Sequence, residues 1–441
     1  MFISQFLFQS AWVFTILACL QMTTGFLTAN NQCFDVCACP SKFDINCNSR
    51  ALQTFPVFDL PAEFWTTFHL NVRLDHNILS EIPFGVFRNF THCQRYKVIY
   101  LLLQNNHISE IRYGAFLGLE HLSVVLHLEN NNLTYISHEF TQFRGLHQLY
   151  IERNPLVVTG IPDDVIRQMF SYNELGTVNL GSYELLKKVM KYQQNRINTL
   201  RMIDMNQAHF DHGLFVKGHA TNLKYLDIYN CAFSDYSEIL CNLALGRLSL
   251  IRCQKVNDTT LQGCHQHLAN ALHVIDCGTT DAFDPSAFYS APLTELTLRG
   301  NISHVPQTLL HHWPQIRTIT LTGHIRGIQR EDFKGLSELR HLSISGDTSI
   351  TYVDNEAFNT NLKLEQLSIL NYDTFSQLTP SIKHLTNLKQ LVLPDMLCTC
   401  VSMGDLKGGN YSSVDIRGNC KYSIPGQSIK AYLQYNIIAC P

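Results

Sequence analysis

The sequence predicts an α/β-type repeat solenoid, in which short parallel strands stack into one concave sheet between two cysteine-rich ends. Three observations predict this fold class. One apolar phrase recurs along most of the 441 residues, eight of the 15 cysteines lie at the two ends of the recurring region, and the punctuation by Gly and Pro leaves no long helical pattern. Such periodicity is typical of chains that stack one structural unit on the next.

The composition excludes several classes of protein. Apolar residues make up 45% of the chain, charged residues make up 16%, and the formal net charge is −3. A disordered chain has fewer apolar and more charged residues, and a nucleic-acid-binding protein carries a basic field. We therefore expect a folded protein with no nucleic-acid partner.

The N-terminus predicts export. Residues 1–25 contain no charged residue, and residues 11–20 form an apolar run. We interpret 1–25 as a signal peptide with cleavage near residue 25 or 29, because small residues follow the run. A signal anchor is the alternative, but Gln5, Gln9 and Ser10 interrupt the apolar segment. The chain has no second long apolar stretch, so no membrane span or lipid anchor is expected.

Glycosylation sequons agree with export. An Asn-x-Ser/Thr triplet marks a site at which a glycan is added in the secretory pathway. Five such triplets occur, and their acceptors are Asn89, Asn132, Asn257, Asn301 and Asn410.

The recurring phrase is L-x-L-x-x-N-x-L. Its clearest copies begin at Val72, Leu101, Leu126 and Leu149, and two weaker copies contain Val178/Leu180 and Leu200/Met202. About 14 copies place their second apolar position between residues 74 and 393, at a mean spacing of about 24.5 residues. In L-x-L the two apolar side chains point to one face of a strand, so stacked strands bury a continuous core. The following Asn ends the strand, and its amide can satisfy buried backbone groups of neighbouring coils.

The phrase and its spacing resemble the extracellular leucine-rich repeat family. The resemblance covers nearly the whole mature chain and implies a horseshoe with a parallel concave sheet. It implies a cysteine-rich N-terminal cap over 33–60, about 14 repeats over 61–397 and a cysteine-rich C-terminal cap over 398–441. It also implies four disulfides: Cys33–Cys39, Cys37–Cys47, Cys398–Cys420 and Cys400–Cys440.

The other cysteines of the mature chain fall into three groups. Cys231, Cys253 and Cys277 occupy the Asn position of three successive copies, and we expect them to be buried thiols. Cys241 and Cys264 occupy nearly equivalent convex positions, so a bridge between them is open. Cys93 is expected to be free or to pair between chains. The segment 264–267 (CHQH) superficially suggests zinc, but it lacks a second pair at ligand spacing, so no metal site is expected.

No motif in the sequence predicts catalysis. The 20 histidines do not form a zinc-protease motif, and the sequence contains neither a G-x-S-x-G nucleophile elbow nor a phosphate-binding glycine loop. We therefore expect neither enzymatic activity nor a cofactor.

A protein partner is expected on the concave face. The outward residues of the later copies are mainly Ser and Thr, whereas those of the earlier copies include Tyr and Arg, which are favoured at interfaces. We predict that Tyr150 and Tyr229 anchor the partner and that nearby charges provide complementarity. The predicted patch comprises His127, Glu129, Tyr150, Glu152, Arg201, Asp227 and Tyr229. For any one of them, an ordinary solvated strand residue is the alternative interpretation.

The sequence therefore predicts a secreted, non-enzymatic, monomeric or weakly dimeric protein that binds an extracellular protein. Three alternatives stay open: an ectodomain-like fragment of a Toll-type receptor, a non-catalytic subunit of a secreted enzyme complex, and, remotely, a secreted hydrolase. Binding of sulphated glycans is disfavoured because the chain has no basic run. Apolar spacing within 165–170 and 185–190 predicts convex helices in irregular coils, where a kink is open and the repeat frame is least defined.

Overall fold

The computed structural model describes residues 32–34, 36–59, 68–92, 98–173, 175–193, 196–205, 214–215, 222–230, 243–253, 270–279, 292–371, 379–421 and 427–440. These residues form two compact units. Unit 1 contains the described residues through Met205 together with 222–223, and unit 2 contains 214–215 together with the described residues from Lys224 onward. The expected signal peptide lies outside the described residues.

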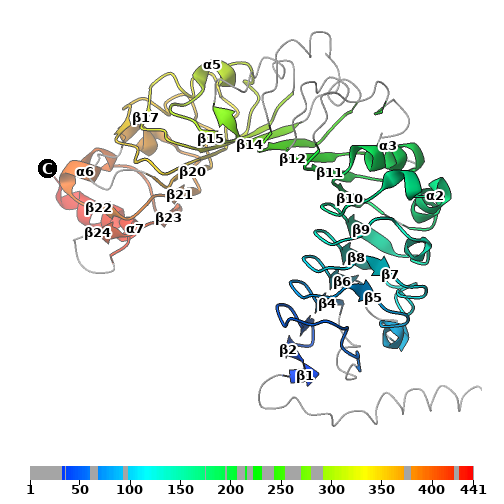
Figure 1. The fold of residues 1–441 in the computed structure, drawn as a ribbon. Helices are drawn as coiled ribbons and strands as arrows, with labels where there is room; N and C mark the ends of the chain where they lie inside the picture. The colour runs from blue at the N-terminus through cyan, green and yellow to red at the C-terminus, as the bar shows by residue number, and fades with distance from the viewer. Residues whose placement is uncertain are drawn as a thin grey trace, which may run out of the picture. The chain divides into compact units, whose positions relative to one another are not determined.

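Unit 1 is a stack of coils, each of which contributes one strand to a sheet (Figure 1). An antiparallel start, β1 to β3, is followed by strands that pair in parallel with the next coil. The strands of this sheet are β1 Gln32–Phe34, β2 Cys37–Ser41, β3 Asp44–Asn46, β4 His69–Arg73, β6 Val98–Leu102, β8 Val124–His127, β9 Leu146–Tyr150, β10 Thr177–Leu180 and β11 Thr199–Ile203.

Unit 2 repeats the same parallel pairing. Its strands are β12 Tyr225–Tyr229, β13 Arg247–Ile251, β14 Ala271–Thr279, β15 Glu295–Asn301, β16 Thr318–Thr322, β18 His341–Ser345, β20 Gln366–Ile369, β21 Gln390–Val392 and β23 Asp415–Arg417. Their register matches each L-x-L phrase to the next, as in Leu296↔Ile319 and Leu298↔Leu321. The parallel solenoid predicted from the phrase is confirmed in both units.

Short strands and helices lie outside the main sheet. The short strands are β5 Glu81–Ile82, β7 Glu110–Ile111, β17 Gly327–Ile328, β19 Tyr352–Val353, β22 Met396–Leu397 and β24 Cys420–Lys421. The helices are η2 Arg88–His92, η3 His138–Thr141, η4 Val158–Gly160, α2 Asp163–Tyr172, α3 Tyr183–Tyr192, α5 Gln307–Leu310, η8 Pro380–His384, α6 Cys400–Met403, η9 Gly404–Leu406, α7 Ile429–Ala431, η10 Tyr432–Asn436 and η11 Ile437–Ala439. Helices α2 and α3 confirm the two helical segments expected in the irregular coils. Their apolar faces are buried, including Val165 and Met169 in α2 and Leu185 and Val189 in α3.

An asparagine ladder ties the coils of unit 1 together. The Asn131 amide donates to the carbonyls of Leu103 in the preceding coil and Leu128 in its own coil, at 3.0 and 3.1 Å. Its Oδ1 accepts from the backbone N–H of Ile108 at 3.0 Å. Asn106 makes the equivalent bonds one coil earlier. The side chain therefore satisfies backbone groups that the strand leaves unpaired, as the sequence predicted.

Cysteine performs the same task in unit 2. Cys277 Sγ lies 3.2 Å from Leu250 O and 3.4 Å from Ile275 O, so its single S–H is shared between them, and it accepts from the backbone N–H of Cys253 at 3.2 Å. Cys253 and Cys277 are both buried thiols, as expected. Contact with Cys253 lowers the pKa of the Cys277 thiol to about 7. Cys231, the third cysteine of this group, lies outside the described residues, as do Cys93, Cys241 and Cys264.

Disulfides close the two ends of the chain's coils. Cys37–Cys47 forms in the antiparallel start of unit 1, and Cys398–Cys420 and Cys400–Cys440 form in unit 2, as the resemblance implied. Cys39 is also disulfide-bonded. The side chain of Cys33, its expected partner, is outside the described part of the chain.

Candidate functional site

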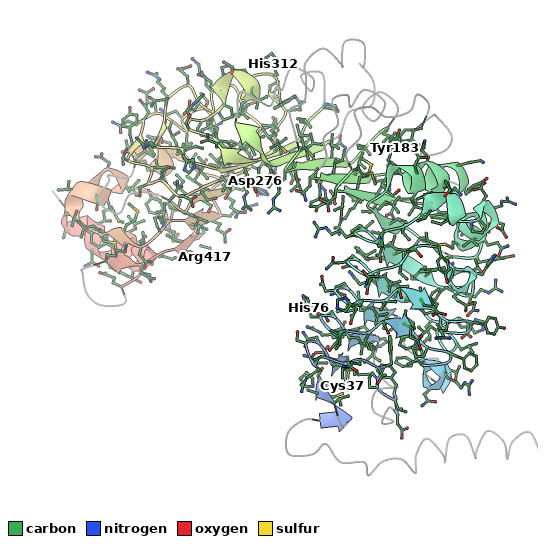
Figure 2. The ribbon with its side chains drawn as sticks, viewed as in Figure 1. Cys37, His76, Tyr183, Asp276, His312 and Arg417 are labelled. Atoms are coloured by element: carbon green, nitrogen blue, oxygen red, sulfur yellow. A yellow bond between two sulfur atoms is a disulfide. The ribbon has the colours of Figure 1, made fainter. Side chains whose placement is uncertain are left out.

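The register of unit 1 aligns its outward side chains in columns. One column contains the residue between the two core positions of each coil, namely Arg73, Leu102, His127, Tyr150, Asn179 and Arg201. Two residues further along each coil, the next column contains Asp75, Gln104, Glu129 and Glu152. We call these two columns the open face of unit 1. In Figure 2, His76 lies on the strand side of this unit, whereas Tyr183, at the start of α3, lies on the helical side.

Two aromatic side chains of the open face form a rigid pair. The rings of His127 and Tyr150 stack with centroids 4.0 Å apart and planes 7° from parallel. His127 Nδ1 lies 2.9 Å from Glu129 Oε1, and the Tyr150 hydroxyl donates to Gln148 Oε1 at 2.7 Å. Burial raises the pKa of the Tyr150 hydroxyl, and the nearby charge of Arg201 opposes this shift. Four of the predicted patch residues thus lie within electrostatic reach of one another.

The fifth predicted residue in this unit, Glu152, is a buried carboxylate. It is only 8% exposed, and burial raises its pKa, a shift to which the neighbouring Glu129 charge adds. Asn179 donates to Glu152 Oε1 at 3.3 Å. Sequence reasoning did not single out Asn179, although its position between Val178 and Leu180 is the only signal that could have placed it on this face.

Four oxygen acceptors on the open face have no hydrogen-bond donor among the described residues. They are Gln104 Oε1, Glu129 Oε2, Glu152 Oε2 and Asn179 Oδ1. They come from four successive coils. A buried acceptor without a donor costs about 1–3 kcal/mol. This arrangement favours a ligand that brings donors.

The two predicted residues of unit 2 lie on β12. Asp227 is 2% exposed and lies 3.4 Å from Arg247. The guanidinium of Arg247 also lies over the ring of Tyr225, which is 41% exposed. Tyr229 is half-buried. Asp227 therefore already has a basic neighbour, and the exposed aromatic on this strand is Tyr225, which the sequence pattern did not select.

The outward residues of the later strands are mainly small and uncharged, as the sequence indicated. Thr297, Thr320, Ser343 and Ser368 align in one column of unit 2. In the next column, the hydroxyls of Thr322 and Ser345 lie 3.0 Å apart. Two residues are exceptions: His273 pairs in register with Thr297 and lies 3.1 Å from Glu295, and Arg299 pairs with Thr322 and lies 3.5 Å from Asp276.

The described residues contain no group of His, Cys, Asp and Glu suited to hold a metal ion. The segment 264–267 lies outside them. No helix in the described part of the chain is long and apolar enough to cross a membrane. Of the five sequon asparagines, Asn89, Asn132, Asn301 and Asn410 are exposed, and Asn257 is not described.

Two family models match the chain. A leucine rich repeat model matches residues 97–156, and a model of the BspA type leucine rich repeat region, with six copies, matches residues 279–400. With the coil register and the asparagine ladder, these matches define the class of fold: the chain contains leucine-rich repeats that stack into a solenoid. Neither match is to a catalytic family.

Several solved structures are similar to the chain at low sequence identity. The TLR13–ssRNA13 complex is 16% identical with a TM-score of 0.41, over 82% of this chain and 75% of that one. An internalin of Listeria monocytogenes is 14% identical with a TM-score of 0.39, over 84% and 86%. The Toll–Spatzle complex of Drosophila is 14% identical with a TM-score of 0.48, over 75% and 45%. No curated protein sequence matches the chain.

Proposed function

We propose that this leucine-rich repeat protein is secreted, has no enzymatic activity, and binds an extracellular protein through the predicted patch. The predicted concave surface corresponds in unit 1 to the open face. His127, Glu129, Tyr150, Glu152 and Arg201 form its recognition surface. The other two residues of the predicted patch, Asp227 and Tyr229, lie on β12 of unit 2. Secretion is supported by the disulfides, because such bonds persist in oxidising compartments, and by the exposed sequons.

The stacked His127–Tyr150 pair is the observation that carries this proposal. A tyrosine held by stacking and by its hydroxyl bond to Gln148 loses little side-chain entropy when a partner binds. Rigid aromatic side chains with charged neighbours are typical binding hot spots, whereas serine and threonine are under-represented there. The hydroxyl columns over β16, β18 and β20 of unit 2 offer no comparable anchor.

The test uses the chain to capture binding proteins from the fluid that contains it and measures the amount captured. The Tyr150→Ala variant is compared with the Tyr113→Ala variant. Tyr113 is 79% exposed and lies between β7 and the next coil, away from the open face. We expect proteins captured by the unmodified chain to be lost with Tyr150→Ala, by about tenfold or more, and kept with Tyr113→Ala. Equal capture by both variants, with both folded, would contradict the proposal.

A further inference from the structure

We infer that the carboxylates of Glu129 and Glu152, together with the Asn179 amide oxygen, form a receptor for an arginine side chain of the protein partner. The inference rests on the proposed function and deepens it, because it names the chemistry that the partner presents. Three independent observations support it: the inventory of acceptors, the burial of an uncharged member, and the aromatic pair alongside.

The first observation is that donors are missing where acceptors gather. Three donors on this face already have acceptors. His127 Nδ1 lies within hydrogen-bond distance of Glu129 Oε1, Asn179 donates to Glu152 Oε1, and the Tyr150 hydroxyl donates to Gln148. Glu129 Oε2, Glu152 Oε2 and Asn179 Oδ1 are left without a donor among the described residues. Because all of these atoms are acceptors, the complementary group is one that only donates, as lysine and arginine do.

The second observation concerns Asn179, which is not acidic. It is 4% exposed, its nitrogen donates to Glu152, and its oxygen has no donor among the residues described. A neutral amide held beside a buried carboxylate in this way adds a further acceptor without adding charge. Because Asn179 carries no charge, repulsion between acidic side chains does not explain why its buried Oδ1 has no donor among the described residues.

The third observation distinguishes arginine from lysine. A guanidinium is planar, carries five donors in a fixed fork, and stacks on aromatic rings. Acceptors from three adjacent coils and the parallel rings of His127 and Tyr150 suit a planar multiple donor better than a compact ammonium group.

The guanidinium reaches the oxygens when the Glu129 side chain at the rim turns. That side chain is 23% exposed, so it can turn without unpacking the core, while the stacked His127–Tyr150 pair stays in place. Glu152 and Asn179, which are more deeply buried, stay in place and form the floor. The partner's arginine then contributes the donors that the unbound face lacks.

The test measures fluorescence anisotropy of labelled octa-arginine with the full chain, and of octa-citrulline, its uncharged isostere. Glu129→Gln/Glu152→Gln is compared with Glu81→Gln/Glu110→Gln, which removes the same charge from two neighbouring coils of unit 1. Glu81 and Glu110 pair in register on β5 and β7, and Arg112 lies 2.7 and 3.7 Å from their carboxylates. Glu129→Gln alone serves if the double variant does not fold.

We expect octa-arginine to bind at least about tenfold more tightly than octa-citrulline, and Glu129→Gln/Glu152→Gln to remove about that factor. The control pair should change the affinity less than about twofold. Equal losses in both pairs would reduce the effect to general electrostatics and overturn the inference, as would equal binding of octa-citrulline. A third outcome separates the two proposals: Tyr150→Ala abolishes capture, but octa-arginine binding does not change in Glu129→Gln/Glu152→Gln. That result would support the proposed function and overturn the arginine receptor.

Discussion

The residue type at several buried positions is explained by the backbone groups to which its side chain hydrogen-bonds. Asn131 and Cys277 occupy equivalent positions in different coils, and each lies within hydrogen-bond distance of a carbonyl of the preceding coil and of its own coil and accepts one N–H. The amide has two hydrogens for the two carbonyls, whereas the thiol has one. The thiol is a weaker donor and acceptor than the amide. The ladder therefore requires both functions in one small buried side chain rather than asparagine itself.

Substitutions at Asn131 test this equivalence. Asn131→Ala leaves two carbonyls and one N–H without the amide, and we expect it to cost roughly 2–4 kcal/mol of the free energy of unfolding. Asn131→Cys should recover part of that loss, because the thiol of Cys277, at this position in unit 2, donates its one S–H to a carbonyl and accepts one backbone N–H. Urea denaturation of the three proteins under reducing conditions measures the difference. Identical losses for Ala and Cys would show that the thiol does not replace the amide.

Glu152 predicts a pH dependence with a definite sign. Its pKa in the folded chain is raised above the ordinary 4.5 by burial, so near pH 5 the folded state binds more protons than the unfolded state. The contribution of Glu152 to the free energy of unfolding is therefore largest below the unfolded-state pKa of 4.5. It decreases as the pH rises from there to the raised pKa of the folded state.

We expect Glu152→Gln to be more stable than the unmodified chain at pH 7, by about 1 kcal/mol, because no charge is then buried. The advantage should disappear below about pH 4, where the carboxyl is protonated in both states. Paired thermal melts of the two proteins across this range provide the measurement. A constant difference at every pH would contradict the assignment of a raised pKa.

At the scale of elements, close approach between coils limits which residues fit. Gly346 follows β18 with φ +156°, and a Cβ there would lie 1.6 Å from the carbonyl oxygen of Gly323 in the preceding coil. Gly323 in turn lies against Ile302 and Gly300. Three glycines at the same position of successive coils thus let these backbones pack more closely than a side chain permits.

We expect Gly346→Ala to destabilise the protein by about 1–3 kcal/mol, because the coils must separate to admit the methyl group. Gly404, in the same unit, has no atom within 4 Å of the place that a Cβ would occupy, so Gly404→Ala should be neutral or slightly stabilising. Melting temperatures of the two variants check this contrast. A tolerated alanine at 346 would show that the coils are not in close contact.

The elements were predictable because their signals are local. Each L-x-L phrase names a strand and its buried face, so even the weak copies at Val178/Leu180 and Leu200/Met202 have their predicted positions on β10 and β11. The burial of Glu152 and Asp227 was not predictable in this way. Exposure on the open face depends on the side chains of adjacent coils, as with Asn179 beside Glu152 and Arg247 beside Asp227. Single-coil patterns do not encode those contacts.

At the scale of the molecule, the chain consists of similar coils that group into two compact units. The division falls at the C-terminal side of the irregular region where the sequence allowed a kink. The outward faces of the two units also differ chemically: aromatic and acidic side chains mark the open face of unit 1, and hydroxyl columns mark β16, β18 and β20 of unit 2. This asymmetry is the basis for placing the anchoring residues of the partner in unit 1.

Site-specific photocrosslinking tests that placement most directly. A benzophenone amino acid replaces Tyr100, which is 36% exposed on β6 and register-paired with Val125 beside His127, or Tyr113, which is 79% exposed elsewhere in unit 1. Both variants are irradiated in the fluid that contains the partner, and covalent adducts are identified by mass spectrometry. We predict an adduct with one protein from position 100 and none of that protein from position 113. The same adduct from position 113 alone would contradict recognition through the open face.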